Sequence, residues 1–161
     1  QTCALPIFTT DHMTYPFAVH LAQVSIDKDT GESKVERFAV AYDIGRAVNP
    51  MMIEGQIQGG YAQGLGGALY EEFLYSANGA PQSVSLADYT MPGSCEVLKV
   101  ETLILEDSPT DRNPLGIKGA GEAGVSGVGA AIANAVADAL RNQTAVTRIP
   151  LTPALVLAAK G

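Results

Sequence analysis

The sequence has little positive charge, few cysteines and no long apolar run, and each shortage excludes a class of protein. Ten Lys and Arg stand against seventeen Asp and Glu in 161 residues, a net charge of −7, so the basic stripe that nucleic-acid binding requires is missing. No stretch reaches the roughly 18 apolar residues of a membrane span, and no charged start followed by an apolar run marks a signal peptide. Cys3 and Cys95 form neither a disulfide framework nor a zinc site.

Motifs of several common enzyme classes are missing as well. The patterns G-x-S-x-G, H-E-x-x-H and C-x-x-C do not occur, so the sequence gives no support to serine-hydrolase, zinc-protease or thiol-redox chemistry. His12 and His20 are the only histidines, and His20 lies in an alternating apolar stretch, where a structural role is favoured. The composition, 47% hydrophobic and 17% charged, is typical of a globular domain. We expect a cytoplasmic protein, with the periplasm as the alternative.

The opening residues do not resemble the rest of the chain. Residues 1–7 lack a Met and any strand or helix periodicity, and they read as the in-frame translation of a short sequencing adapter. We therefore expect residues 1–7 to be a non-native leader joined to a truncated gene, and residues 8–161 to be native protein. A genuine irregular N-terminus is the alternative.

The hydrophobic periodicity predicts an α+β fold, with a β-hairpin and further strands packed against two main helices. Alternating residues predict a hairpin of two strands, at 17–26 and 38–42, around a turn at 27–32. Further strands are expected at 83–85, 98–104 and 146–149. Apolar residues at three- and four-residue steps predict a helix from Pro50 to about residue 71, a second at 130–141 and a last helical turn after Pro153.

The first predicted helix carries an unusual load of glycine. Each interior glycine costs roughly 0.8–1 kcal/mol relative to alanine, so close approach of another group, or a local break, is needed to offset it. Close packing against another backbone is the favoured explanation, and close approach of a cofactor is the alternative. The six glycines are Gly55, Gly59, Gly60, Gly64, Gly66 and Gly67.

A second glycine-rich passage, Gly119 to Gly124, matches G-x-G-x-x-G. A dinucleotide-binding role is excluded by context, because a proline-containing loop precedes it and no strand-end acid follows. Backbone N–H groups at the start of a helix form an anion-tolerant concavity. Glu122 lies in that concavity, where it is either a first-turn acid that complements the helix dipole or a functional carboxylate. Lys118, beside the passage, could neutralise an anionic ligand, although a lone loop lysine is usually solvated.

Several segments, in this order, resemble the C-terminal end of the molybdopterin-binding large subunit of the molybdenum hydroxylases, the family of xanthine dehydrogenase, aldehyde oxidoreductase and aerobic carbon monoxide dehydrogenase. Each segment is weak evidence, but their order is specific, and the resemblance runs from about Thr14 to the end. The segments are residues 15–17, 43–50, 55–66, 88–89, 113–116, 118–124 and 131–135.

The resemblance implies a site and a reaction. Glu122 matches the family's catalytic base, which takes the proton from a molybdenum-bound hydroxide during oxidative hydroxylation of an aldehyde or N-heterocycle, or oxidation of CO, with water as the oxygen source. Gln56 would lie towards the cofactor, and Lys118, Gly119, Ala120 and Gly121 would line the same site. No protein side chain is expected to bind the metal directly.

The resemblance also implies cofactors and partners. The cofactor would be molybdenum-molybdopterin in its cytosine dinucleotide form, with iron–sulfur and FAD groups on other domains or subunits of an oligomeric protein. Residues 8–161 would be the C-terminal portion of a larger molybdopterin-binding domain, inactive alone. A stand-alone binding or assembly module that uses the glycine-rich helix mouth is the alternative function.

Overall fold

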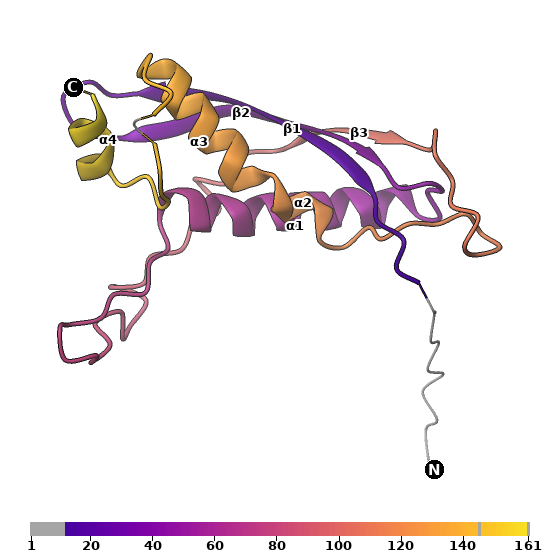
Figure 1. Cartoon of the computed structure of the whole chain (residues 1–161), viewed down its shortest axis with the longest axis horizontal. Helices are drawn as coiled ribbons and strands as arrows, with labels where there is room; N and C mark the ends of the chain where they lie inside the picture. Colours follow the sequence, from indigo (N-terminus) through magenta and orange to yellow (C-terminus); the bar gives the residue numbers. More distant parts are fainter. Residues whose placement is uncertain (1–11, 145, 161) are drawn as a thin grey trace, which may run out of the picture.

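Three strands and four helices are arranged in the order β1–β2–α1–β3–α2–α3–α4 in the computed structural model, which describes residues 12–144 and 146–160 (Figure 1). The elements are β1 (Phe17–Ile26), β2 (Ser33–Asp43), α1 (Pro50–Leu69), β3 (Glu101–Leu105), α2 (Ala123–Ser126), α3 (Val128–Ala139) and α4 (Pro153–Ala159). The α+β prediction is confirmed, as are the hairpin and the positions of the two main helices. Residues 1–7, the expected leader, lie outside the described residues.

The sheet has the order β1–β2–β3, so β2 is its central strand. β1 pairs antiparallel to β2 through the predicted hairpin, whereas β3 pairs parallel to β2, which requires the long crossover that contains α1. The register of the hairpin shifts between Gln23 and Val24. Opposite this shift β2 carries two consecutive exposed residues, Glu36 and Arg37, as expected of one extra residue in the strand.

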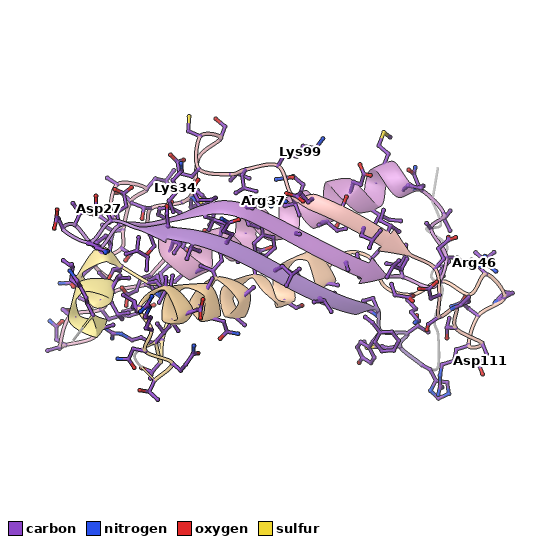
Figure 2. The ribbon with its side chains drawn as sticks, turned by 90° about the horizontal axis from the view of Figure 1, so that it is seen from above. Asp27, Lys34, Arg37, Arg46, Lys99 and Asp111 are labelled. Carbon is purple, nitrogen blue, oxygen red and sulfur yellow. The ribbon has the colours of Figure 1, made fainter. Side chains whose placement is uncertain are left out.

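The helices cover one face of the sheet and leave the other open. Figure 2, seen from above, shows the three strands in front of α1 and α3. The core lies between these layers, where buried residues from the central strand meet apolar residues of the two helices. These residues are Phe38, Val40 and Tyr42 of β2, Ile57, Tyr61 and Leu65 of α1, and Val128, Ile132 and Val136 of α3.

The alternating apolar residues at the start of β1 do not point towards this core. Phe17, Val19 and Leu21 are more than 60% exposed, because the odd-numbered residues of β1 point to the open face. Val24 and Ile26 lie on the other face and pack against the core. The two apolar phases seen in the sequence are therefore the two faces of one strand, one of them uncovered.

Helix α1 begins where the sequence predicts. The Asn49 side chain caps it by accepting a hydrogen bond from the Met52 N–H at 3.2 Å, and Pro50 occupies the first turn. The helix is continuous to Leu69 in spite of its glycines, so the predicted alternative of a local break is wrong. A Cβ added at Gly60 would lie 2.6 Å from the backbone of Gly124, so close packing against another backbone is confirmed there.

Two of the short strands predicted from the sequence do not form. At 83–85 the Ser83 hydroxyl instead accepts a hydrogen bond from the Leu74 N–H and donates one to the Glu72 carbonyl, an interaction that competes with strand pairing. The described residues of 146–149 pair with no strand. The chain there runs across the end of α1, where the Leu151 N–H donates to the Ala68 carbonyl.

The remaining elements lie close to their predicted positions. The strand expected at 98–104 is β3, five residues long. The last helical turn is α4, whose cap is the Thr152 side chain and whose first residue is Pro153. Of the helices in the described part of the chain, none combines the length and apolar character needed to cross a membrane.

Candidate functional site

The glycine-rich passage lines a cleft of about 1220 Å³ that lies against the first residues of β1. One wall is formed by residues that precede or begin β1, and the other by the loop before α2 together with the start of α2. The cleft brings together segments about a hundred positions apart in the sequence. Its lining includes Thr14, Tyr15, His20, Arg112, Asn113, Lys118, Gly119, Gly121, Glu122 and Gly127.

The loop that enters the glycine-rich passage is tied to its neighbours by backbone hydrogen bonds. The Lys118 N–H donates to the Ile44 carbonyl at 2.9 Å, and the Gly119 N–H donates to the Thr14 carbonyl at 3.0 Å. The Thr14 hydroxyl donates to the Ile117 carbonyl at 3.3 Å. The loop therefore has a fixed path between the end of β2 and the segment before β1.

Glu122 is exposed at the start of α2, beside the cleft. Its backbone carbonyl accepts hydrogen bonds from the Val125 N–H and the Ser126 hydroxyl, but its side chain does not cap the helix. Among the described residues, no hydrogen bond or ion pair engages its carboxylate. Because the carboxylate is not used within the fold, it is available to a ligand or a substrate in the cleft.

Two glycines that precede Glu122, Gly119 and Gly121, would tolerate a Cβ without a steric clash. A Cβ added at Gly119 would meet nothing nearer than the Thr14 carbonyl oxygen at 3.6 Å, and one at Gly121 nothing nearer than Gln56 Oε1 at 3.7 Å. Gln56 is exposed on α1 and thus lies beside Gly121, but it is not part of the cleft lining. Ala120 is half-buried and packs against the core instead.

The side chain of Lys118 is buried, so the expectation of a solvated lysine is wrong. Its Nζ lies 3.8 Å from Asp43 Oδ1 and 4.2 Å from the centre of the Phe17 ring. The lysine side chain is only 8% exposed. Asp43 also accepts hydrogen bonds from the N–H groups of Gly45 and Ser108, each at 3.0 Å. The lysine thus lines the cleft, but its charge is already paired within the fold.

His20 has the structural role that the sequence favours. Its ring packs on Gly127, where an added Cβ would lie 2.4 Å from the ring, and lies edge-on to Phe38. Nε2 is 3.0 Å from the Ala123 carbonyl oxygen, so Nε2 carries the proton. Burial lowers the pKa of His20, and the hydrogen bond to Ala123 opposes this shift. The ring is therefore neutral near pH 7.

Tyr42 is a contributor to the site that sequence reasoning did not identify. The strand alternation predicts its burial, but not that its hydroxyl donates to the Gly119 carbonyl at 2.9 Å, across 77 positions of sequence. Burial raises the pKa of Tyr42 to about 12, against the effect of a hydrogen bond from the Ala123 backbone. The phenol is therefore protonated at every physiological pH.

The described residues contain no group of three or more His, Cys, Asp or Glu side chains placed to hold a metal ion. The features that the site does offer are a carboxylate with no partner among the described residues, two exposed glycines just before it and a cleft.

Comparison with known proteins identifies relatives of this chain. A family model described as a molybdopterin cofactor-binding domain matches residues 7–98. The chain is 42% identical over 147 residues to the 6-hydroxypseudooxynicotine dehydrogenase complex subunit gamma of Paenarthrobacter nicotinovorans, covering 91% of this chain and 18% of that protein. It is 36% identical over 136 residues to the carbon monoxide dehydrogenase large chain of Afipia carboxidovorans, covering 84% and 17%.

Solved structures agree with these sequence matches. The fold superposes on a Cu,Mo-CO dehydrogenase with a TM-score of 0.88 and 33% identity, covering 94% of this chain and 19% of that one. It superposes on quinoline 2-oxidoreductase from Pseudomonas putida 86 with a TM-score of 0.80 and 37% identity, covering 88% and 18%. The chain therefore spans less than a fifth of the length of each of these relatives.

Proposed function

Because the chain belongs to the family of molybdopterin cofactor-binding domains, we propose that it is the part of a molybdenum hydroxylase subunit that carries the general base, Glu122. One observation carries the proposal: an exposed carboxylate with no partner among the described residues lines the cleft directly after Gly121. A carboxylate that served only the helix dipole would not need to face a cleft. A base must reach the proton that it abstracts, and this position allows it.

The residues present fit a bulky cofactor. Gly119 and Gly121 would lie against it with their backbone, since both are exposed in the cleft lining and carry no side chain. Gln56 would approach from α1 on the side of Gly121, and Ala120 would support the passage from the core. When bound, the molybdenum cofactor supplies a water-derived oxygen and accepts electrons from the substrate.

Lys118 would act indirectly in this arrangement. Its ammonium group is paired with Asp43, so it would fix the loop rather than neutralise an anionic ligand. Glu122 would accept and hold the proton that the hydroxylation releases in the cleft. The cleft would orient the substrate and limit the access of water.

We further propose the finer features of the whole protein that the family resemblance implies. The cofactor would be the cytosine dinucleotide form, and iron–sulfur and FAD groups would lie on other domains or subunits of a cytoplasmic oligomer. The relatives named above include a subunit of a dehydrogenase complex and a large chain, which supports partner subunits. The substrate would be an aldehyde, an N-heterocycle or CO.

We also propose that residues 8–161 are the C-terminal portion of the cofactor-binding domain and that residues 1–7 are not native. Sequencing the source DNA across and upstream of these codons tests this proposal. An open frame that continues for several hundred codons, without the opening heptapeptide, would support it. A frame that starts at Gln1 would refute it and would favour the binding-module alternative.

The base assignment is tested by Glu122→Gln in the assembled subunit that carries this segment. Glutamine keeps the size of the side chain but cannot accept the proton, so we expect kcat to fall at least about 100-fold, with molybdenum content unchanged. Turnover and metal content measured on the same preparations check this. Glu72→Gln, at an exposed glutamate after α1, is the matched control. Turnover retained in Glu122→Gln would contradict the assignment.

A further inference from the structure

The face of the sheet that the helices leave open carries an apolar patch that runs across all three strands (Figure 2). Val19 of β1 lies opposite Ala41 of β2, which in turn lies opposite Leu103 of β3. The four large side chains of the patch are each 57–65% exposed. The open-face patch consists of Phe17, Val19 and Leu21 of β1, Ala39 and Ala41 of β2, and Leu103 of β3.

Charged groups lie at the two ends of the open-face patch and not within it. At one end, Arg37 donates hydrogen bonds of 2.9 and 3.0 Å to the carboxylate of Glu101. At the other end, the Lys118 ammonium lies 4.2 Å from the centre of the Phe17 ring, and its charge is paired with Asp43. Apolar side chains scattered singly over a surface are ordinary, whereas a contiguous set with a polar border is typical of an interaction surface.

The direction of the strands gives a second reason to expect a cover on this face. Parallel strands are typical of sheets with both faces covered, whereas an antiparallel hairpin often leaves one face to water. β3 pairs parallel to β2, yet α1 and α3 cover one face only. Leu103, on the parallel strand, is 57% exposed on the other face. Within the described residues, the sheet therefore lacks one of the two layers that its parallel pair favours.

The size of the open-face patch favours a cover from the same polypeptide over a second copy of the chain. A stable interface between separate chains buries about 800 Å² and roughly 20–30 residues on each side, whereas the patch offers six residues. A covalently joined segment does not need that area, because the linkage keeps its local concentration high. The chain spans 19% of the CO dehydrogenase chain on which it superposes, so most of a subunit of that length lies outside it.

We propose that the open-face patch is the docking surface for one apolar segment of the remaining part of the same subunit. The inference rests on the proposal that this chain is a portion of a longer subunit, and not on the role of Glu122. A single helix, about 10 Å across, is wide enough, since the first and third strands of a sheet lie roughly 10 Å apart. The docked segment also covers the outer side of the Phe17 ring, above the Lys118–Asp43 pair.

The first measurement is the rate at which iodoacetamide labels Val19→Cys, followed by mass spectrometry of the peptide that contains the new thiol. Val84→Cys is the matched control, because Val84 is 72% exposed, Val19 is 61% exposed, and Val84 lies outside the patch. In the 161-residue chain the two thiols should react at similar rates. In the full-length subunit, Val19→Cys should react at least about 100-fold more slowly than in the urea-unfolded subunit, because a covered thiol reacts only through local opening.

The second measurement identifies the occupant in the assembled enzyme. A photo-crosslinking residue, p-benzoylphenylalanine, replaces Leu21, which is 65% exposed in the patch. We expect a crosslink to a peptide of the same subunit outside residues 8–161, which leaves the mass of the subunit on a denaturing gel unchanged. A crosslink to a second copy, which doubles that mass, or to a different subunit would overturn the proposal.

Two further results would overturn the proposal. In the first, Val19→Cys in the full-length subunit reacts as fast as in the 161-residue chain, so that the face is open to water. In the second, the reading frame starts at Gln1, which removes the longer subunit together with its covering segment. Sequencing of the DNA separates these two failures. Neither labelling nor crosslinking involves turnover, so retained activity in Glu122→Gln, which contradicts the base assignment, is distinguishable from both.

Discussion

Helix α1 presents glycine to two very different surroundings. On the face towards α2 and α3, added Cβ atoms would lie 2.6 Å from the Gly124 backbone at Gly60 and 2.5 Å from Val128 at Gly64. Elsewhere along the helix, Gly55, Gly59 and Gly67 have nothing within 4 Å. The first set, Gly60 and Gly64, permits close packing of α1 against α2 and α3. The second set, Gly55, Gly59 and Gly67, makes no such contact within the described residues.

The difference separates glycines that serve packing from glycines that leave space open. A glycine costs a helix roughly 0.8–1 kcal/mol, and only the first set offsets that cost with contacts that the structure describes. Gly121 lies between the two sets, because an added Cβ would be at an ordinary contact distance of 3.7 Å from Gln56 Oε1.

The strongest test of this comparison is Gly60→Ala. Overpacking a closed site costs about 1–3 kcal/mol, and this contact is at the upper end because its partners are backbone atoms that cannot change rotamer. The gain in helix propensity offsets roughly 0.8–1 kcal/mol. We therefore expect the free energy of unfolding to fall by about 2 kcal/mol, measured by urea denaturation of the 161-residue chain. An unchanged midpoint would show that α1 and α2 are not in contact.

The next test is Gly59→Ala, at the adjacent residue of the same helix, which also serves as the control for Gly60→Ala. Because nothing lies within 4 Å of the added methyl group, only the propensity term remains. The free energy of unfolding should rise by roughly 0.8–1 kcal/mol. The same substitution thus has opposite signs at neighbouring positions. A loss of stability at Gly59 in the isolated chain would mean that its surroundings are packed.

Local patterns were enough to predict most of the elements of this fold. The alternation at 38–42, the Asn49–Pro50 start of α1 and the Thr152–Pro153 start of α4 are all local signals, and each was confirmed. The outward direction of Phe17 was not predictable, because alternation shows that a strand has two faces but not which one is covered. The parallel pairing of β3 depends on the path of the crossover and not on local sequence.

In the candidate site, too, local features could be predicted from the sequence and long-range contacts could not. Glu122 and its glycines form a contiguous motif, so resemblance to a family could single them out. The phenol of Tyr42 and the paired charge of Lys118 depend on contacts 75 or more positions apart in sequence, and no local pattern reports those. A lysine beside a glycine-rich loop looks solvated in the sequence because the Asp43 carboxylate that pairs with it lies at the end of a distant strand.

The smallest expected effect on stability is that of Gly121→Ala, and it is the most informative about the cofactor. The backbone of Gly121 lies outside the left-handed region, and the added methyl group would be at an ordinary contact distance of 3.7 Å from Gln56 Oε1. The free energy of unfolding of the chain should therefore stay within about 0.5 kcal/mol of the wild type.

In the assembled subunit, however, the methyl group of Gly121→Ala would occupy space that we assign to the cofactor. The molybdenum content should therefore fall, and it should fall further with Gly121→Val. Full molybdenum content in both variants would show that the cofactor does not approach Gly121 closely.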